Sequence, residues 1–70
     1  MLAADIKAKL KAGGVSMGTW MSMAHPSIAE IMGSAGYDWV VIETEHTAID
    51  VSEVLPLIIA IEHAGAVPLV

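Results

Sequence analysis

The residues best suited to chemistry follow a short apolar run in the middle of the chain. Trp39 to Ile42 is largely β-branched and apolar, which is typical of a parallel strand that is buried on both faces. Glu43, Glu45 and His46 follow it with no apolar residue between them. Because ligands bind at the carboxyl ends of parallel strands, two carboxylates and an imidazole are expected where a site would form.

These three side chains allow three interpretations. In the first, His46 is a general base, since an imidazole titrates near neutral pH, and a neighbouring carboxylate orients it. In the second, His46 binds a metal ion with Glu43 or Glu45. Continued strand alternation would place both glutamates on one side and His46 on the other, which disfavours this interpretation. In the third, the segment is a solvated loop without a chemical role, and the residues alone leave all three open.

Composition indicates that the chain needs a partner surface. Seventy residues form at most one small domain, and such a domain buries only about 60% of its unfolded surface. Yet 56% of the residues are hydrophobic, mean hydropathy is +0.69, and no cysteine is available for a disulfide. We therefore expect the excess apolar surface to be covered by more of the same domain, or alternatively by another subunit.

Charge and hydropathy exclude several classes of partner. Lys7, Lys9 and Lys11 are the only cationic residues, there is no arginine, and the net charge is −5. Binding to nucleic acid requires clustered basic residues, so it is not expected. No apolar run approaches the ~20 residues of a membrane span, and no secretory signal is evident, so we expect no membrane association and a cytoplasmic location.

Periodicity and turn signals predict helices and strands in strict alternation. The third helix is apolar nearly all round, which indicates burial on both sides, and Asp50 with Glu53 resembles a capping box. Trp20 lies near the end of the first strand, where it either lines a pocket or packs in a core. The predicted elements are a helix over Ala3–Ala12, a strand over Val15–Met23, a helix over Pro26–Gly36, a strand over Tyr37–Ile42, a helix from Asp50 to Gly65 and a strand over Val67–Val70.

This order, α-β-α-β-α-β, predicts an α/β fold with a parallel sheet and right-handed crossovers. Three such strands cannot cover both faces of their sheet, so the pattern matches the amino-terminal portion of a (β/α)8 TIM barrel. A doubly wound sheet is the alternative, although no glycine-rich phosphate-binding motif follows either of the first two strands. A non-catalytic interaction module, docking through its apolar third helix, would instead fold by itself.

Four segments resemble the amino-terminal part of the HpcH/HpaI family. They are GTWM at 18–21, HPSIAEI at 25–31, AGYDWVVIETEH at 35–46 and VPLV at 67–70. The family comprises class II, metal-dependent pyruvate aldolases that act on 2-keto-3-deoxy sugar acids and related 4-hydroxy-2-oxo acids. The resemblance implies that residues 1–70 are the first part of a single TIM-barrel domain of about 250 residues, usually assembled as a homohexamer.

The resemblance also implies a reaction and roles for particular residues. A 4-hydroxy-2-oxo acid is reversibly cleaved to pyruvate and an aldehyde, with Mg, Mn or Co stabilising the enolate. His46 would be the general base, acting through water, and Trp20 would line the pocket of the keto acid. Glu45 would lie close to the metal's water shell, with Glu43 as a second such candidate. No metal ligand is expected before Val70, so the 70 residues alone should be inactive.

Two features depart from the family pattern. Many members have I-D-G-E-H where this chain has I-E-T-E-H, so Glu43 is longer than the usual Asp and Thr44 stiffer than Gly. The difference is expected to change the loop or the substrate range. Relatives of the citrate lyase β-subunit, which act on acyl-CoA compounds, are the alternative within this architecture. They use basic residues early in the barrel to hold an acyl-CoA or a dicarboxylate, and no such arginine occurs here.

Overall fold

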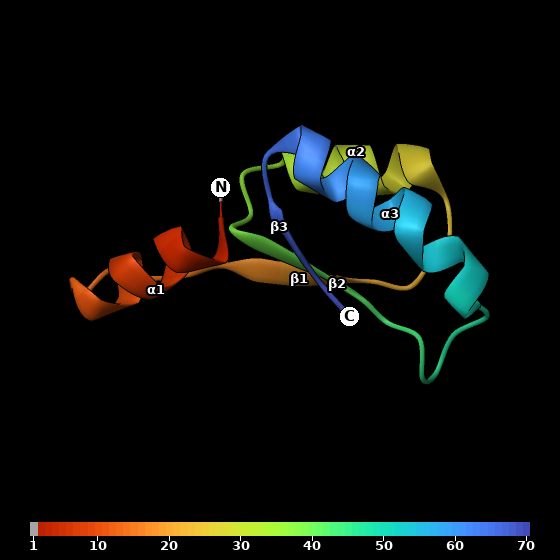
Figure 1. Ribbon diagram of the computed structural model, residues 1–70, viewed down its shortest axis with the longest axis horizontal. Coiled ribbons are helices and arrows are strands. Elements are labelled where there is room, and N and C mark those ends of the chain that lie inside the picture. The colour runs from red at the N-terminus through yellow and green to blue at the C-terminus, as the bar shows by residue number, and fades with distance from the viewer. Residues whose placement is uncertain (1) are drawn as a thin grey trace.

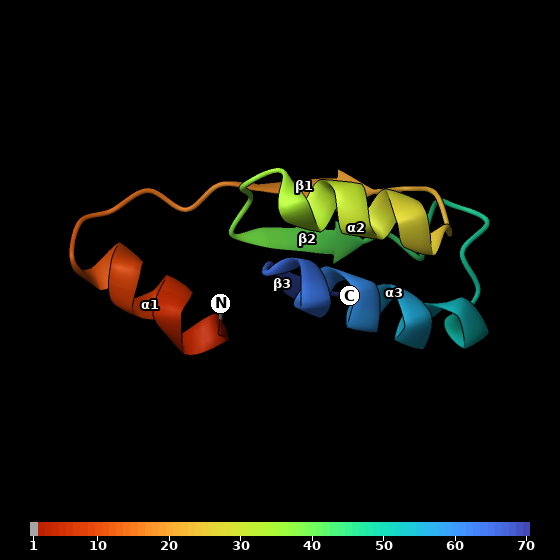
Figure 2. The same ribbon diagram turned by 90° about the horizontal axis from the view of Figure 1, so that it is seen from above.

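The computed structural model describes residues 2–70 and shows helices and strands in the predicted order. The three strands form one parallel sheet with β2 in the middle and β1 and β3 at its edges. Helices α2 and α3 lie side by side on one face of this sheet, whereas α1 lies apart from them (Figures 1 and 2). The elements are α1 (Ala3–Lys11), β1 (Gly18–Met21), α2 (Pro26–Ser34), β2 (Trp39–Ile42), α3 (Val51–Ala64) and β3 (Val67–Leu69).

The first strand is shorter than predicted at both ends. Pairing with β2 begins at Gly18, which faces Trp39. Just before it, the Asp38 N–H donates to the Met17 carbonyl over 2.7 Å, and the Met17 N–H donates to Asp38 Oδ2 over 3.2 Å. Just after it, the chain turns, with the His25 N–H donating to the Met23 carbonyl over 3.0 Å. The extended segment outruns the strand because its neighbour, β2, is only four residues long.

Helix α3 begins and ends as the sequence indicates. Asp50 Oδ1 accepts the Val51 N–H over 2.8 Å, and Glu53 Oε1 accepts the Asp50 N–H over 2.9 Å, which forms the predicted capping box. The helix ends at Gly65, whose φ of +102° lies in the left-handed region that glycine adopts without strain.

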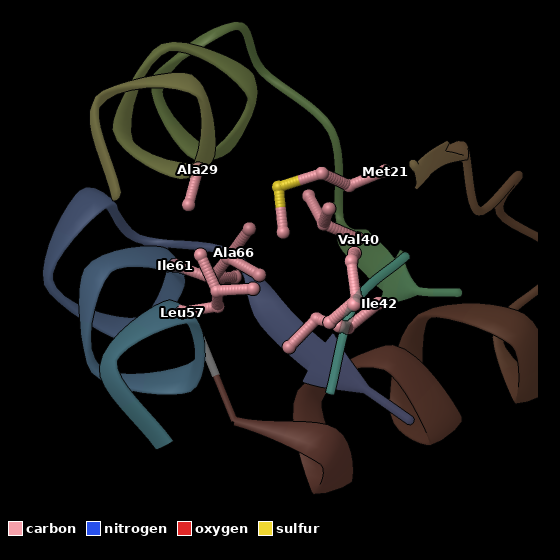
Figure 3. Close-up of a cluster of buried hydrophobic side chains, with 8 residues drawn as sticks. Met21, Ala29, Val40, Ile42, Leu57, Ile61 and Ala66 are labelled. Carbon is pink, nitrogen blue, oxygen red and sulfur yellow. The ribbon is translucent and has the colours of Figure 1, made fainter. Parts of the chain in front are cut away.

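The core lies between the sheet and the two helices on its covered face (Figure 3). Met21, Val40 and Ile42 project from the strands toward Leu57 and Ile61 of α3, and all five side chains are essentially inaccessible to solvent. A side chain larger than glycine at position 33 of α2 would place its Cβ 2.6 Å from that of an α3 alanine, so the two helices pack closely.

The opposite face of the sheet carries apolar side chains that are not buried. Trp20, Val41 and Leu69 are aligned across the strands, and Trp20 and Leu69 are 62% and 44% exposed. The prediction that β2 is buried on both faces is therefore wrong for residues 2–70: Val40 and Ile42 are buried, but Val41 is only half-buried. Among these residues no helix crosses this face of the sheet (Figure 1).

Burial of α3 on both sides is also not observed. Leu57 and Ile61 face the core, whereas Val51 is 81% and Leu55 64% exposed. Sequence periodicity identifies apolar surface but not what covers it, and the described chain covers only one side of this helix. No helix in residues 2–70 combines the length and the hydropathy that a membrane span requires.

An ion pair joins α1 to the sheet. Lys9 Nζ lies 2.9 Å from Oδ2 of Asp38, a buried residue immediately before β2. The hydrogen bond from Lys9 holds the pKa of Asp38 below its usual range, although burial opposes this effect. Since α1 itself has no buried residue, this contact is the principal described link between α1 and the body of the chain.

Gly18 is required by the side chain that lies across it. A Cβ at this position would be 1.8 Å from Cδ2 of Trp39, whose Nε1 donates to Ser16 Oγ over 3.1 Å. We expect Gly18→Ala to displace the indole and to lower the free energy of unfolding of the intact protein by about 2 kcal/mol. Urea denaturation measures this loss. Combining Gly18→Ala with Trp39→Leu should destabilise less than the sum of the single changes, and strict additivity would contradict the proposed clash.

Candidate active site

The polar cluster lies in the loop that leaves the carboxyl end of the central strand. Strand β2 ends at Ile42, and the chain then turns away from the sheet before α3 begins at Val51 (Figure 1). Glu43, Glu45 and His46 are therefore the first residues beyond the sheet edge. This is the placement that the sequence predicted for them.

Glu43 organises this loop through its own carboxylate. Its Oε1 accepts the backbone N–H of Glu45 over 2.8 Å. Both carboxylate oxygens also accept the backbone N–H of His46, each over 3.0 Å. A further hydrogen bond comes from Thr47, whose hydroxyl donates to the Glu43 carbonyl over 2.5 Å. These short-range bonds bend the chain within a few residues of the strand.

The same contacts set the charge state of Glu43. Its side chain is only 16% exposed, and the backbone hydrogen bond from His46 is the main reason why the pKa of Glu43 lies below its usual range. Partial burial opposes this shift without reversing it. Glu43 is therefore a carboxylate at neutral pH, held beside the imidazole.

His46 stands between the two carboxylates. Its Nδ1 lies 3.5 Å from Glu43 Oε1, its Nε2 lies 3.9 Å from Glu45 Oε1, and its side chain is 80% exposed. The separation that continued strand alternation would produce does not occur, because the strand has already ended at Ile42. The imidazole is thus solvent-accessible and flanked by negative charge, which suits a group that accepts a proton.

A pocket of about 320 Å³ adjoins this cluster at the carboxyl ends of all three strands. Trp20 of β1 lines it, as one of the two interpretations of that residue predicted. His46 is not among the lining residues, although Glu43 and Glu45 on either side of its ring are. The lining residues are Trp20, Val41, Ile42, Glu43, Thr44, Glu45 and Val70.

Sequence reasoning missed the apolar part of this pocket. The sequence predicts Val41 as part of a doubly buried strand, and Val70 only as the end of the third strand. Knowledge of the strand register would have identified Val41 as a pocket residue, because Trp20, Val41 and Leu69 are paired across the sheet. A larger groove of about 680 Å³ is lined by Ile31, Ala64 and neighbouring residues of α2 and α3, at the opposite end of these helices from the loop.

The cluster does not supply a complete set of metal ligands. Glu43, Glu45 and His46 can each present one ligand atom, all within 4.8 Å of one another. However, the Glu43 carboxylate already accepts two backbone N–H groups. Glu45 and His46, both exposed, are therefore the two residues of the cluster whose ligand atoms are not engaged in holding the loop. The arrangement fits proton transfer better than metal binding.

Comparison with known sequences identifies relatives over most of the chain. The family model described as HpcH/HpaI aldolase/citrate lyase matches residues 16–70. A 5-keto-4-deoxy-D-glucarate aldolase of Salmonella paratyphi A is 39% identical over 64 residues, which are 91% of this chain and 25% of that protein. The enzyme of the same name from Salmonella newport is 38% identical over the same share of both chains.

Solved structures show the same arrangement of elements. A citrate synthase, SbnG, superposes with a TM-score of 0.80 at 38% identity, over 90% of this chain and 26% of that one. An HpcH/HpaI aldolase from Desulfitobacterium hafniense superposes with a TM-score of 0.73 at 31% identity, over 90% of this chain and 25% of that one. The chain spans about a quarter of the length of these relatives. The family match, the sequence relatives and the shared fold agree with the resemblance noted from the sequence, and the chain belongs to the HpcH/HpaI aldolase/citrate lyase family.

Proposed function

We propose that this chain is the amino-terminal portion of a (β/α)8 barrel that reversibly cleaves a 4-hydroxy-2-oxo acid to pyruvate and an aldehyde. The observation that carries the proposal is His46, held beside Glu43 and Glu45, two carboxylates that line a pocket together with Trp20. Family membership and relatives named as aldolases support a lyase reaction.

The uncovered surfaces support the barrel. Strands β1 and β3 each have one unpaired edge, and Trp20, Val41 and Leu69 form an apolar layer on the open face. In a closed barrel this face becomes the packed interior, and further strands pair with both edges. Residues 1–70 would then be the first part of one domain. We propose that the whole protein is a cytoplasmic homo-oligomer, a hexamer by family resemblance.

His46 is the proposed general base. In the cleavage direction it accepts, through a water molecule, the proton of the substrate's 4-hydroxyl group. The C3–C4 bond then breaks, its electron pair goes to C3 to form the enolate of pyruvate, and the former hydroxyl oxygen becomes the aldehyde carbonyl. The proton held by His46 is returned to C3 through water. Glu43 beside Nδ1 favours a proton on that nitrogen, which leaves Nε2 to accept.

The cofactor that we propose is a divalent cation, Mg, Mn or Co, held by residues beyond Val70, as the family resemblance implies. When bound, it supplies positive charge that stabilises an enolate. Within this chain, Trp20 and Val41 provide apolar walls beside the keto acid, and Glu45 lies where it can hydrogen-bond water at the pocket rim.

A second candidate is carbon–carbon chemistry on a citrate-like acid. The superposition on a citrate synthase has a higher TM-score and identity than that on the aldolase from Desulfitobacterium hafniense. Against it, the described pocket is lined by two glutamates and by no basic residue, which disfavours a tricarboxylate or the phosphates of coenzyme A. The aldolase is therefore the better supported function.

An assay of the whole protein distinguishes the two candidates. With Mg, Mn or Co added, we expect pyruvate to be released from at least one member of a panel of 4-hydroxy-2-oxo acids, as measured by a coupled lactate dehydrogenase reaction. The 70 residues alone are expected to release none. Pyruvate release from no panel member, together with turnover of citrate or of acetyl-CoA, would replace the aldolase with the second candidate.

A further inference from the structure

Thr44 has a role in the loop that differs from that of its neighbours. It is exposed and lines the pocket together with Trp20. Within residues 2–70 its hydroxyl takes part in no hydrogen bond, whereas the Glu43 carboxylate and the backbone N–H groups of Glu45 and His46 are all engaged. A free hydroxyl at the edge of a pocket is available to a ligand.

The second threonine of the loop provides the contrast. Thr47 Oγ1 donates to the Glu43 carbonyl over 2.5 Å and accepts the Ile49 N–H over 3.2 Å. Its hydroxyl is therefore part of the loop's own framework. The two threonines, three residues apart, thus differ: the Thr47 hydroxyl is engaged within the loop, whereas that of the pocket-lining Thr44 is not.

Charge around Thr44 restricts what its hydroxyl can bind. Glu43 is held as a carboxylate, the Glu45 side chain is 83% exposed, and both line the same pocket. The lysines are all in α1, beyond the opposite end of the sheet (Figure 1). A substrate carboxylate next to Thr44 would be repelled by these glutamates, whereas a neutral hydroxyl group could hydrogen-bond to threonine and glutamate alike.

We propose that Thr44 is a specificity-determining residue whose hydroxyl hydrogen-bonds a neutral hydroxyl group on the aldehyde half of the substrate. The inference rests on the proposed aldolase reaction and deepens it. A substrate that lacks the matching hydroxyl leaves the polar group of the site without a hydrogen-bond partner. Its transition state is therefore bound more weakly than that of a substrate that has the hydroxyl. Thr44 therefore favours hydroxylated aldehydes over aliphatic ones of the same size.

Two aldehydes of nearly equal size test this proposal. Glycolaldehyde and propionaldehyde differ by a hydroxyl in place of a methyl group, and kcat/KM for their addition to pyruvate is measured with the whole protein. We expect Thr44→Val, which keeps the shape of the side chain, to lower kcat/KM for glycolaldehyde about tenfold, equivalent to about 1.4 kcal/mol. The value for propionaldehyde should change little, and Thr44→Ser, which keeps the hydroxyl, should preserve the wild-type ratio.

Thr47→Val is the matched control. It removes a hydroxyl from the same loop, and we expect it to lower kcat/KM for both aldehydes by the same factor. If Thr44→Val also affects both aldehydes equally, or neither, the assignment of Thr44 is overturned while the aldolase reaction stands. If the wild-type protein adds pyruvate to neither aldehyde and cleaves no 4-hydroxy-2-oxo acid, the proposed function fails, and the inference about Thr44 fails with it.

Discussion

His46→Ala is expected to lower kcat for retro-aldol cleavage by about 10²- to 10⁴-fold, the range that a general base typically contributes. Stability should be nearly unchanged, because the His46 side chain is 80% exposed and lies outside the hydrophobic core. Such surface changes usually alter the free energy of unfolding by less than about 0.5 kcal/mol. Steady-state kinetics and urea denaturation of the same preparations separate the two effects.

His63 offers a matched control for this variant. It is also an exposed histidine, but it lies in the last turn of α3, beside the groove at the far end of the helices from the loop. We expect His63→Ala to retain close to wild-type activity. A His46→Ala enzyme with an unchanged kcat would remove His46 from the mechanism. If kcat fell equally in His46→Ala and His63→Ala, the cause would be disturbed folding and not the loss of a catalytic base.

Glu43→Ala is expected to have the next largest effect, lowering kcat by about 10²-fold, as loss of a residue that orients a catalytic group commonly does. Glu43 holds the backbone of Glu45 and His46 with hydrogen bonds of 2.8 and 3.0 Å, so its removal frees the imidazole from its position. Glu43→Gln keeps one acceptor oxygen, so kcat should fall less in this variant than in Glu43→Ala. Both losses are measured as kcat, since positioning a base changes turnover more than substrate binding.

Glu62→Ala is the control for removing a carboxylate. Glu62 is exposed near the end of α3, away from the loop, and its replacement should leave kcat near the wild-type value. If Glu43→Gln lowers kcat as far as Glu43→Ala does, the negative charge rather than the hydrogen bonds carries the effect. If neither variant loses activity, the loop keeps His46 in place without Glu43, which contradicts the proposed role.

The lowered pKa of Glu43 has a consequence at acidic pH. A carboxyl whose pKa is lower in the folded than in the unfolded chain stabilises the fold above its unfolded pKa. It loses that contribution as the pH falls through the folded pKa. We therefore expect the loop to stay ordered as the pH falls through the usual carboxyl range, near 4, and to loosen only below it. Tryptophan fluorescence, to which Trp20 in the shared pocket contributes together with Trp39, measures this change, and Glu43→Gln should lack the acid-side change in emission.

Local sequence determined the elements of this protein and the end of the sheet where chemistry is expected. The capping box at Asp50, the glycine after α3 and the apolar run at Trp39–Ile42 depend on interactions within a few residues, so the predicted order of helices and strands is confirmed. The family resemblance was equally readable, because it depends on the segment around positions 35–46. The bounds of β1 could not be predicted in this way, because the length of a strand depends on the neighbour with which it pairs.

Tertiary structure alone decided how the site is assembled. Alternation along an extended strand would have separated Glu43 and Glu45 from His46, but the Glu43 carboxylate captures two N–H groups and turns the chain instead. The pocket likewise depends on the register that aligns Trp20 with Val41 across the sheet. Periodicity is a property of one segment, whereas convergence and burial are properties of segments in contact. The sequence could therefore name the side chains, but only the folded chain could show which of them meet.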